Sequence, residues 1–287
     1  MTSAYGRVAE RLADGFSGLT FSSFPDGSLD HFSTLYDGER RVRERSVFAE
    51  AVAVGRDSFG VRHERTELGG QSVNAARQAH ALDADVTLVG HLDDERFDLP
   101  FTTASMGRPS EVTVVCFDSD DLLLVTESTA VREWALSDLR TVAPDGVEAF
   151  FAADAVWCGN WATIPNMTAA LGTVATLGGG GTFLFDPGPL SGASEGRIEA
   201  LVDALGSLAE AFDLVVSVNG DEAERLAAAV GVDADRDGRL RALRDRTGSV
   251  VVEHEVDAAL AATATGVVRV PMLDAGSVVT DTGGGDR

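Results

Sequence analysis

The sequence contains no lysine, so all 23 of its basic residues are arginines. It has only two cysteines, Cys116 and Cys158, which is too few for a fold held together by disulfides. No apolar run reaches the roughly 18 residues that a membrane span requires, and the first residues lack the apolar core of a signal peptide. Because 44% of the 287 residues are hydrophobic, intrinsic disorder is excluded as well. We therefore expect a soluble, globular protein of the reducing cytoplasm.

Acidic residues outnumber basic ones by 46 to 23, which gives a formal net charge of −23 at pH 7. Self-repulsion from such a charge destabilises a compact fold in dilute buffer, and salt screens it. We infer adaptation to high salt, and the composition resembles that of cytoplasmic proteins of halophilic archaea. A merely acidic protein of ordinary salinity is the alternative. The negative field disfavours nucleic acids and anionic membranes as partners, and any bound phosphate must be held by arginine, backbone N–H groups or a metal.

Short β-branched runs alternate with Ala- and Leu-rich stretches along most of the chain. This alternation predicts an α/β fold with a mostly parallel central sheet and helices on both faces. The expected strands are 86–90, 155–159, 182–185, 214–218, 250–253 and 267–270. The expected helices are 73–82, 166–177, 195–212, 221–230 and 239–247. Two charged, alternating segments, 39–63 and 110–128, indicate β structure with little helix, and we expect a small β lid on one domain spanning 1–287.

The strongest chemical motif is the glycine run near the end of the chain, Gly283, Gly284 and Gly285, followed by Asp286. Successive glycines leave their backbone N–H groups free to converge on an anion. Asp286 would then lie beside the anion, where its carboxylate can take a proton from an attacking hydroxyl. Taken alone, the same residues also suit an ordinary loop.

Two further motifs occur earlier in the sequence. The Gly69–Gly70 turn opens an expected helix, and Asn74, one turn later, offers a donor and an acceptor for hydroxyl groups. Asn219 and Glu222 follow an expected strand, and this spacing can order a hydrated divalent ion next to phosphates. The first motif also suits a surface turn, and the second suits a plain helix cap.

Together, in this order and spacing, the three motifs resemble the ribokinase-like carbohydrate kinases, also called the phosphofructokinase-B family. The resemblance covers nearly the whole chain and implies a three-layer fold and ATP-dependent phosphorylation of a sugar or sugar phosphate. It implies that Asp286 is the catalytic base and that the preceding three glycines form an anion hole. It also implies that Asn219 and Glu222 order the water shell of the Mg²⁺ that accompanies ATP.

The resemblance extends to the substrate side of the site. The segment from Phe24 to His31 is similar to the family's first-strand segment, whose acid binds sugar hydroxyls, and this role falls on Asp30. Asp26 of the same segment is a further substrate-binding candidate. Gly69, Gly70 and Asn74 match the family's N-terminal signature. The two β-rich segments occupy the place of the family's lid, which implies a homodimer formed through it.

Arg77, three residues after Asn74, and Arg108, at the lid boundary, are candidate contacts for a substrate phosphate. The resemblance therefore makes ribose 1-phosphate a candidate substrate, because salt-adapted archaea have family members with that role. A free hexose, 2-keto-3-deoxygluconate and a nucleoside are alternatives.

Two departures from the family pattern support a second hypothesis, a non-catalytic sugar- or nucleotide-binding protein. Acidic residues in 253–258 stand where the family binds nucleotide phosphates, and acids there would repel phosphates unless a metal or an arginine intervenes. The family also continues beyond its catalytic Asp, whereas this sequence ends at Arg287. We therefore expect either a truncated chain or an incomplete site.

Overall fold

The computed structural model describes residues 4–118 and 120–272. The predicted anion hole, Gly283, Gly284 and Gly285, and the predicted base Asp286 lie outside these residues. Within them, no helix is long and apolar enough to cross a membrane.

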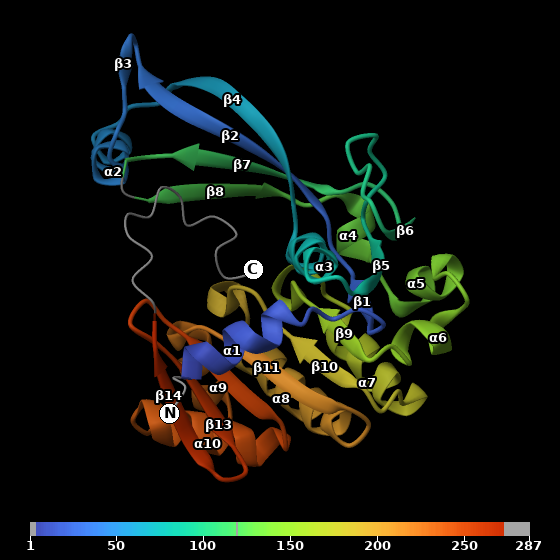
Figure 1. Cartoon of the computed structure of the whole chain (residues 1–287). Coiled ribbons are helices and arrows are strands. Elements are labelled where there is room, and N and C mark those ends of the chain that lie inside the picture. The colour runs from blue at the N-terminus through green and yellow to red at the C-terminus, as the bar shows by residue number, and fades with distance from the viewer. Residues whose placement is uncertain (1–3, 119, 273–287) are drawn as a thin grey trace.

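A nine-stranded sheet forms the centre of the molecule, in the order β14-β13-β12-β11-β10-β9-β1-β5-β6 (Figure 1). The strands from β12 to β6 in this order pair in parallel, and β13 and β14 add an antiparallel edge. The bounds are β1 Thr20–Phe24, β5 Asp85–Gly90, β6 Thr102–Ser105, β9 Ala155–Cys158, β10 Thr182–Phe185, β11 Asp213–Val218, β12 Val250–His254, β13 Ala258–Thr263 and β14 Gly266–Pro271. The predicted α/β class and all six expected strands are confirmed.

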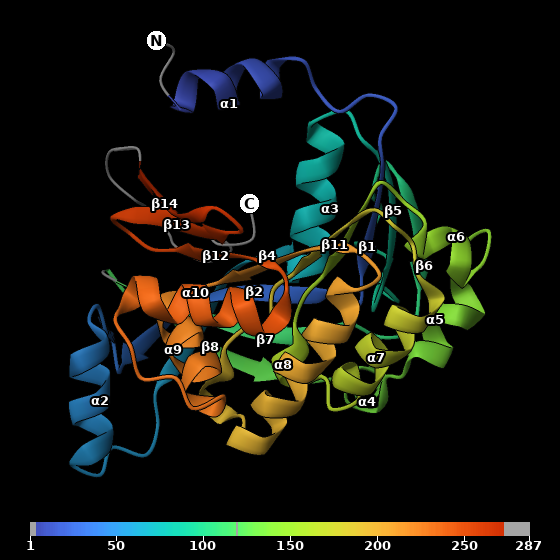
Figure 2. The same cartoon turned by 90° about the horizontal axis from the view of Figure 1, so that it is seen from below.

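Helices cover both faces of this sheet (Figure 2), as the sequence pattern predicts. One face is covered by α7, α8, α9 and α10, together with the short helices α4, α5 and α6, and α3 and α1 lie on the other side. Their bounds are α1 Ala4–Ala13, α3 Gln71–Ala81, α4 Thr129–Glu133, α5 Leu136–Val142, α6 Val147–Phe151, α7 Met167–Leu177, α8 Glu195–Ala209, α9 Gly220–Ala229 and α10 Arg236–Thr247. The core lies mainly under the first face, where Val156, Phe183 and Val216 point from neighbouring strands and are buried.

A second sheet of five strands lies above the main sheet in Figure 1. Its order is β3-β2-β7-β8, and β4 also pairs with β2. The bounds are β2 Ser28–Asp37, β3 Arg40–Arg41, β4 Gly60–Gly69, β7 Ser110–Cys116 and β8 Asp121–Thr126. The segment 110–128 is thus β as expected. The expectation of little helix in 39–63 is wrong at Arg45–Ala53, which forms α2, because Phe48 from α2 packs against Phe59 and Phe117.

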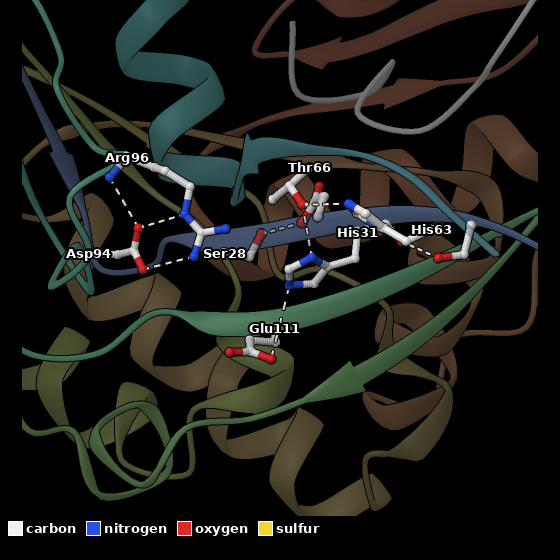
Figure 3. A network of polar contacts seen from close by, with 9 residues as sticks. Ser28, His31, His63, Thr66, Asp94, Arg96 and Glu111 are labelled. Atoms are coloured by element: carbon white, nitrogen blue, oxygen red, sulfur yellow. Dashed lines mark hydrogen bonds and ion pairs between the residues drawn. The ribbon is translucent and has the colours of Figure 1, made fainter. Parts of the chain in front are cut away.

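The second sheet has an apolar cluster at its base and another at its tip, and polar side chains meet between them. At the base, Leu29 packs with residues of α3 and β5, and at the tip Leu35 and Val115 pack beside α2. Between them, the hydroxyl of Thr66 lies 3.0 Å from Nδ1 of His31 and 3.2 Å from Nε2 of His63 (Figure 3). The base therefore fixes the sheet next to the carboxyl ends of the main strands.

The two sheets join where three backbone segments approach closely. A Cβ placed on Gly27 would lie 2.6 Å from the carbonyl oxygen of His91, and one on Gly70 would lie 2.8 Å from Cα of Gly27. Gly70 also has a positive φ of +102°, which favours glycine. Only residues without side chains fit this crossing, so Gly70 of the Gly69–Gly70 pair that the sequence singles out is required by packing.

Candidate functional site

The residues predicted to bind substrate lie at the carboxyl ends of the main strands, where open α/β sheets bind ligands. Asp26, two residues after β1, is buried, and its two carboxylate oxygens accept hydrogen bonds from the backbone N–H groups of Gln71 (3.0 Å) and Ser72 (2.8 Å). These are the first N–H groups of α3, which have no partner within the helix. Asp26 therefore fixes the start of α3 beside the end of β1.

Asp30 lies on β2 directly against Gly69 at the end of β4. A Cβ on Gly69 would lie 2.2 Å from Oδ2 of Asp30, so any side chain at this position would displace the carboxylate. Burial raises the pKa of Asp30, and the charges of Asp26 and Glu67 add to that effect, while a hydrogen bond from Ser28 to Oδ1 (2.7 Å) opposes it. The result is a half-buried carboxyl group beside the glycine turn, which suits the binding of sugar hydroxyls.

Gly70 and Asn74 form the first turn of α3. Gly70 is the N-terminal cap of the helix, and its carbonyl oxygen accepts a hydrogen bond from the backbone N–H of Asn74 at 3.0 Å. The structure thus brings together five of the predicted substrate-binding residues: Asp26, Asp30, Gly69, Gly70 and Asn74.

The two candidate phosphate-binding arginines are exposed. Arg77 lies on α3 after Asn74, and Arg108 precedes β7, where its carbonyl oxygen accepts a hydrogen bond from Ser128. Neither guanidinium has an acid within ion-pairing distance among the residues that the structure describes. Both can therefore meet an anion, although no contact in the structure directs them toward Asp30.

Asn219 and Glu222 form a reciprocal capping box at the start of α9. Oδ1 of Asn219 accepts from the backbone N–H of Glu222, and Oε2 of Glu222 accepts from the backbone N–H of Asn219, both at 2.9 Å. Burial raises the pKa of Glu222 to about 7, helped by the charges of Asp186 and Asp221 and opposed by its hydrogen bonds with Asn219. The alternative of a helix cap is thus realised, and it leaves a buried acid at the end of β11.

A cavity of about 500 Å³ opens beside Glu222, between α9 and the short helix η2, Leu190–Gly192. Its lining is Pro189, Leu190, Ser191, Asn219, Asp221, Glu222, Glu224, Arg225 and Ala228. In the described part of the chain, no group of three or more His, Cys, Asp or Glu side chains could hold a metal ion.

Each of the three acidic side chains in 253–258 has a partner, which is an arginine for two of them and a backbone N–H group for the third. The carboxylate of Glu253, which is fully buried, pairs with Arg236, and Asp257 pairs with Arg236 and Arg269. The carboxylate of Glu255 accepts a hydrogen bond of 2.6 Å from the backbone N–H of Gly220 at the start of α9. Arg236 and Arg269 therefore lie beside the acidic segment, and an arginine there is what the approach of a phosphate would require.

Sequence reasoning did not identify Gln71 or Arg236 as site residues. Gln71 stands inside the Gly-Gly signature, yet its side-chain partners, Asn160 and Asp186, lie 89 and 115 residues away. No local pattern reports such contacts. By contrast, the Asp-Pro turn at Asp186 is visible in the sequence, and the structure shows its carboxylate buried beside the site.

Comparisons with known proteins agree with this arrangement. A family model described as prokaryotic ketohexokinase matches residues 32–286. The ketohexokinase of Haloferax volcanii is 29% identical, over 96% of this chain and 75% of that protein. Among solved structures, the Burkholderia thailandensis nucleoside kinase in complex with inosine has a TM-score of 0.60 and 16% identity, over 93% of this chain and 78% of that one. Escherichia coli phosphofructokinase-2 in complex with fructose-6-phosphate has a TM-score of 0.59 and 13% identity, over 94% and 84%.

The structural neighbours share the ribokinase-like fold, and the family match extends over most of the sequence, from β2 onward. The predicted resemblance to haloarchaeal carbohydrate kinases is thereby confirmed. The chain belongs to the prokaryotic ketohexokinase family, and it is a carbohydrate kinase of the ribokinase-like group.

Proposed function

We propose that the protein transfers the γ-phosphate of ATP to a hydroxyl group of a free ketohexose. The observation that carries the proposal is a series of hydrogen bonds and charge–charge interactions that connects the sugar side of the site to the N-x-x-E motif. The charge of Asp26 acts on Asp30, and the carboxylate of Asp26 accepts a hydrogen bond from the backbone N–H of Gln71. The side chain of Gln71 donates a hydrogen bond to Asp186, whose charge acts on Glu222. Acceptor and donor sites of a kinase must adjoin in this way because phosphoryl transfer depends on positioning.

In the proposed reaction, Asp286 takes the proton of the attacking hydroxyl, whose oxygen forms a bond to the γ-phosphorus as the bond to ADP breaks. The N–H groups of Gly283, Gly284 and Gly285 would stabilise charge on the transferred group. Mg²⁺ bound with ATP would neutralise the phosphates. Asn219 and Glu222 fit a role in its water shell, because the capping box fixes both side chains at the end of β11, where they line the cavity. The cytoplasm is the compartment that supplies ATP.

The decisive test is Asp286→Asn, assayed for ATP consumption in molar KCl. We expect the variant to bind sugar in a calorimetric titration and to lose turnover by several orders of magnitude. Near-normal turnover would show that Asp286 is not the base. Tight sugar binding by the unsubstituted protein, with neither ATP–Mg²⁺ binding nor turnover, would instead establish the non-catalytic binder.

A free ketohexose is favoured over ribose 1-phosphate because the family match is to ketohexokinases. Ketohexoses, aldohexoses, ribose 1-phosphate, 2-keto-3-deoxygluconate and nucleosides should be screened side by side. Arg77→Ala and Arg108→Ala should leave KM for a free ketohexose unchanged. If both substitutions raise KM for a sugar phosphate that is turned over faster than any free sugar, the substrate is the phosphorylated one.

We also propose that the second sheet acts as a lid and as the interface of a homodimer. Leu123, Leu124 and Val125 are half-exposed in succession on its edge strand β8, and such edges readily pair with another chain. Light scattering of the wild type and of Leu124→Asp would test this. A monomeric wild type would contradict the interface.

A further inference from the structure

Gln71 connects the segments that follow three parallel strands. Its backbone N–H donates to Asp26 after β1, and its side-chain Nε2 donates to Oδ1 of Asp186 after β10 at 3.0 Å. Its Oε1 accepts from the backbone N–H of Asn160 after β9 at 2.5 Å. One side chain at the start of α3 therefore sets the spacing between the sugar side of the site and the strand ends that lead to Glu222.

Glycines at these strand ends provide the space for the Gln71 side chain. A Cβ on Gly159 would lie 2.8 Å from Oε1 and 2.9 Å from Cβ of Gln71. On the other side, Gly188 has a φ of +67°, and its N–H donates to the same Asp186 oxygen that Gln71 binds, at 3.0 Å. The ends of β9 and β10 are thus shaped around an amide in one orientation, with its oxygen toward Asn160 and its nitrogen toward Asp186.

Gln71 also lies between two buried carboxylates, one bound to its backbone N–H and the other to its side-chain amide. Asp26 and Asp186 are only 6% and 5% exposed, and both bind Gln71. Burial raises the pKa of Asp186, whereas the hydrogen bonds from Gly188 and Gln71 lower it. A carboxylate at position 71 would meet Asp186 at hydrogen-bond distance, and two carboxylates that close cannot both be ionised readily. The titratable groups around this pair are Asp26, Cys158, Glu222 and His254.

We propose that Gln71 is a positioning residue of the kinase, which holds the glycine turn of α3 in register with the ends of β9 and β10. The proposal rests on the proposed function, because the groups it aligns are the acceptor and donor halves of that site. Gln71 acts through Asp26, Asn160 and Asp186, and no contact with substrate is required of it.

The central test is Gln71→Glu in the full chain, with Gln78→Glu, an exposed position on the same helix, as the matched control. We expect kcat/KM to fall on the order of tenfold to a hundredfold at pH 8, as for other small misplacements of catalytic geometry. Activity should recover partly toward pH 6, because a proton shared with Asp186 relieves the repulsion. The control should show the wild-type pH profile.

Two further variants separate positioning from folding. Adding Asp186→Asn to Gln71→Glu exchanges amide and carboxylate and keeps one hydrogen bond between the two side chains, although the Gly188 N–H loses its acceptor. The double variant has one carboxylate where Gln71→Glu has two, so it should lose the pH dependence of kcat/KM that Gln71→Glu introduces. Gly159→Ala changes no polar atom but displaces the Gln71 side chain, and it should lower kcat/KM while the protein remains folded at the assay temperature.

A Gln71→Glu profile of kcat/KM that matches the Gln78→Glu control would overturn the proposal, as would activity losses that only follow the fraction of unfolded protein. If the wild type phosphorylates no sugar, the proposed function fails separately. Positioning is then measured by calorimetric sugar binding, which Gln71→Glu should weaken more at pH 8 than at pH 6. Equal sugar affinity at both pH values would overturn the proposal in that case.

Discussion

Replacing Glu222 with Gln should stabilise the protein at neutral and alkaline pH. Gln at this position can still accept the backbone N–H of Asn219, so the capping box is retained. The substitution removes only the ability of the buried side chain to ionise. Because Glu222 also belongs to the proposed donor side of the site, we expect the more stable variant to be less active.

The magnitude follows from the pKa of Glu222, which is about 7 in the folded protein against an ordinary value of 4.5. Between these values the folded state holds a proton that the unfolded state has lost, so wild-type stability falls as the pH rises from 4.5 to about 7. At about 1.4 kcal/mol per pKa unit, the buried charge costs about 3 kcal/mol above pH 7. Glu222→Gln should be more stable than wild type by up to that amount at pH 8 and equal to it at pH 4.

Denaturant unfolding in molar KCl, repeated across this pH range, measures the difference directly. The exposed substitution Glu199→Gln on α8 is the control and should shift stability little at any pH. A Glu222→Gln variant that unfolds more readily than wild type at pH 8, or a difference that does not change with pH, would refute the reasoning.

Three further outcomes are expected. The melting temperature should rise steeply from 0.1 to 1 M KCl, because the Debye length falls from about 10 to about 3 Å; a flat response would mean that the net charge of −23 is not an adaptation to salt. Gly69→Ala should raise KM for sugar by displacing the Asp30 carboxylate, whereas Gly172→Ala, in open space on α7, should not. Arg236→Ala should destabilise the fold by about 3 kcal/mol, because it leaves the buried Glu253 carboxylate unpaired. Adding Glu253→Gln should restore most of that loss, as chemical denaturation would record.

The parallel sheet could be predicted from the sequence because its strands are buried on the helix-covered face and appear as continuous apolar runs, as at Thr182–Phe185 and Asp213–Val218. Helix α2 could not be predicted, since it contains no fully buried residue and is held by contacts of Phe48 that form only in the folded sheet. The resemblance places the segment from Phe24 to His31 at the first strand of the fold, whereas Ser28–Asp37 forms β2 of the second sheet.

The candidate site also has a part that the sequence predicts and a part that it does not. Glycine pairs and the N-x-x-E spacing are local, so Gly69, Gly70 and Glu222 could be found by reading along the chain. The contacts of Gln71 with Asp186 and of Arg236 with Glu253 join different elements, and only the folded backbone brings them together. The predicted groups at 283–286 lie outside the described residues, and their roles stay predictions.

The second sheet has a separate hydrophobic cluster at each end, and we expect its two ends to open independently. The tip has its own core, in which Leu35, Val42 and Phe117 pack with Phe48 of α2. Its amide protons can therefore exchange with solvent by local opening that leaves the base, anchored by Leu29, closed. We therefore expect substitutions around α2 to leave the position of Asp30 beside the glycine turn unchanged, whereas substitutions at the base should shift it.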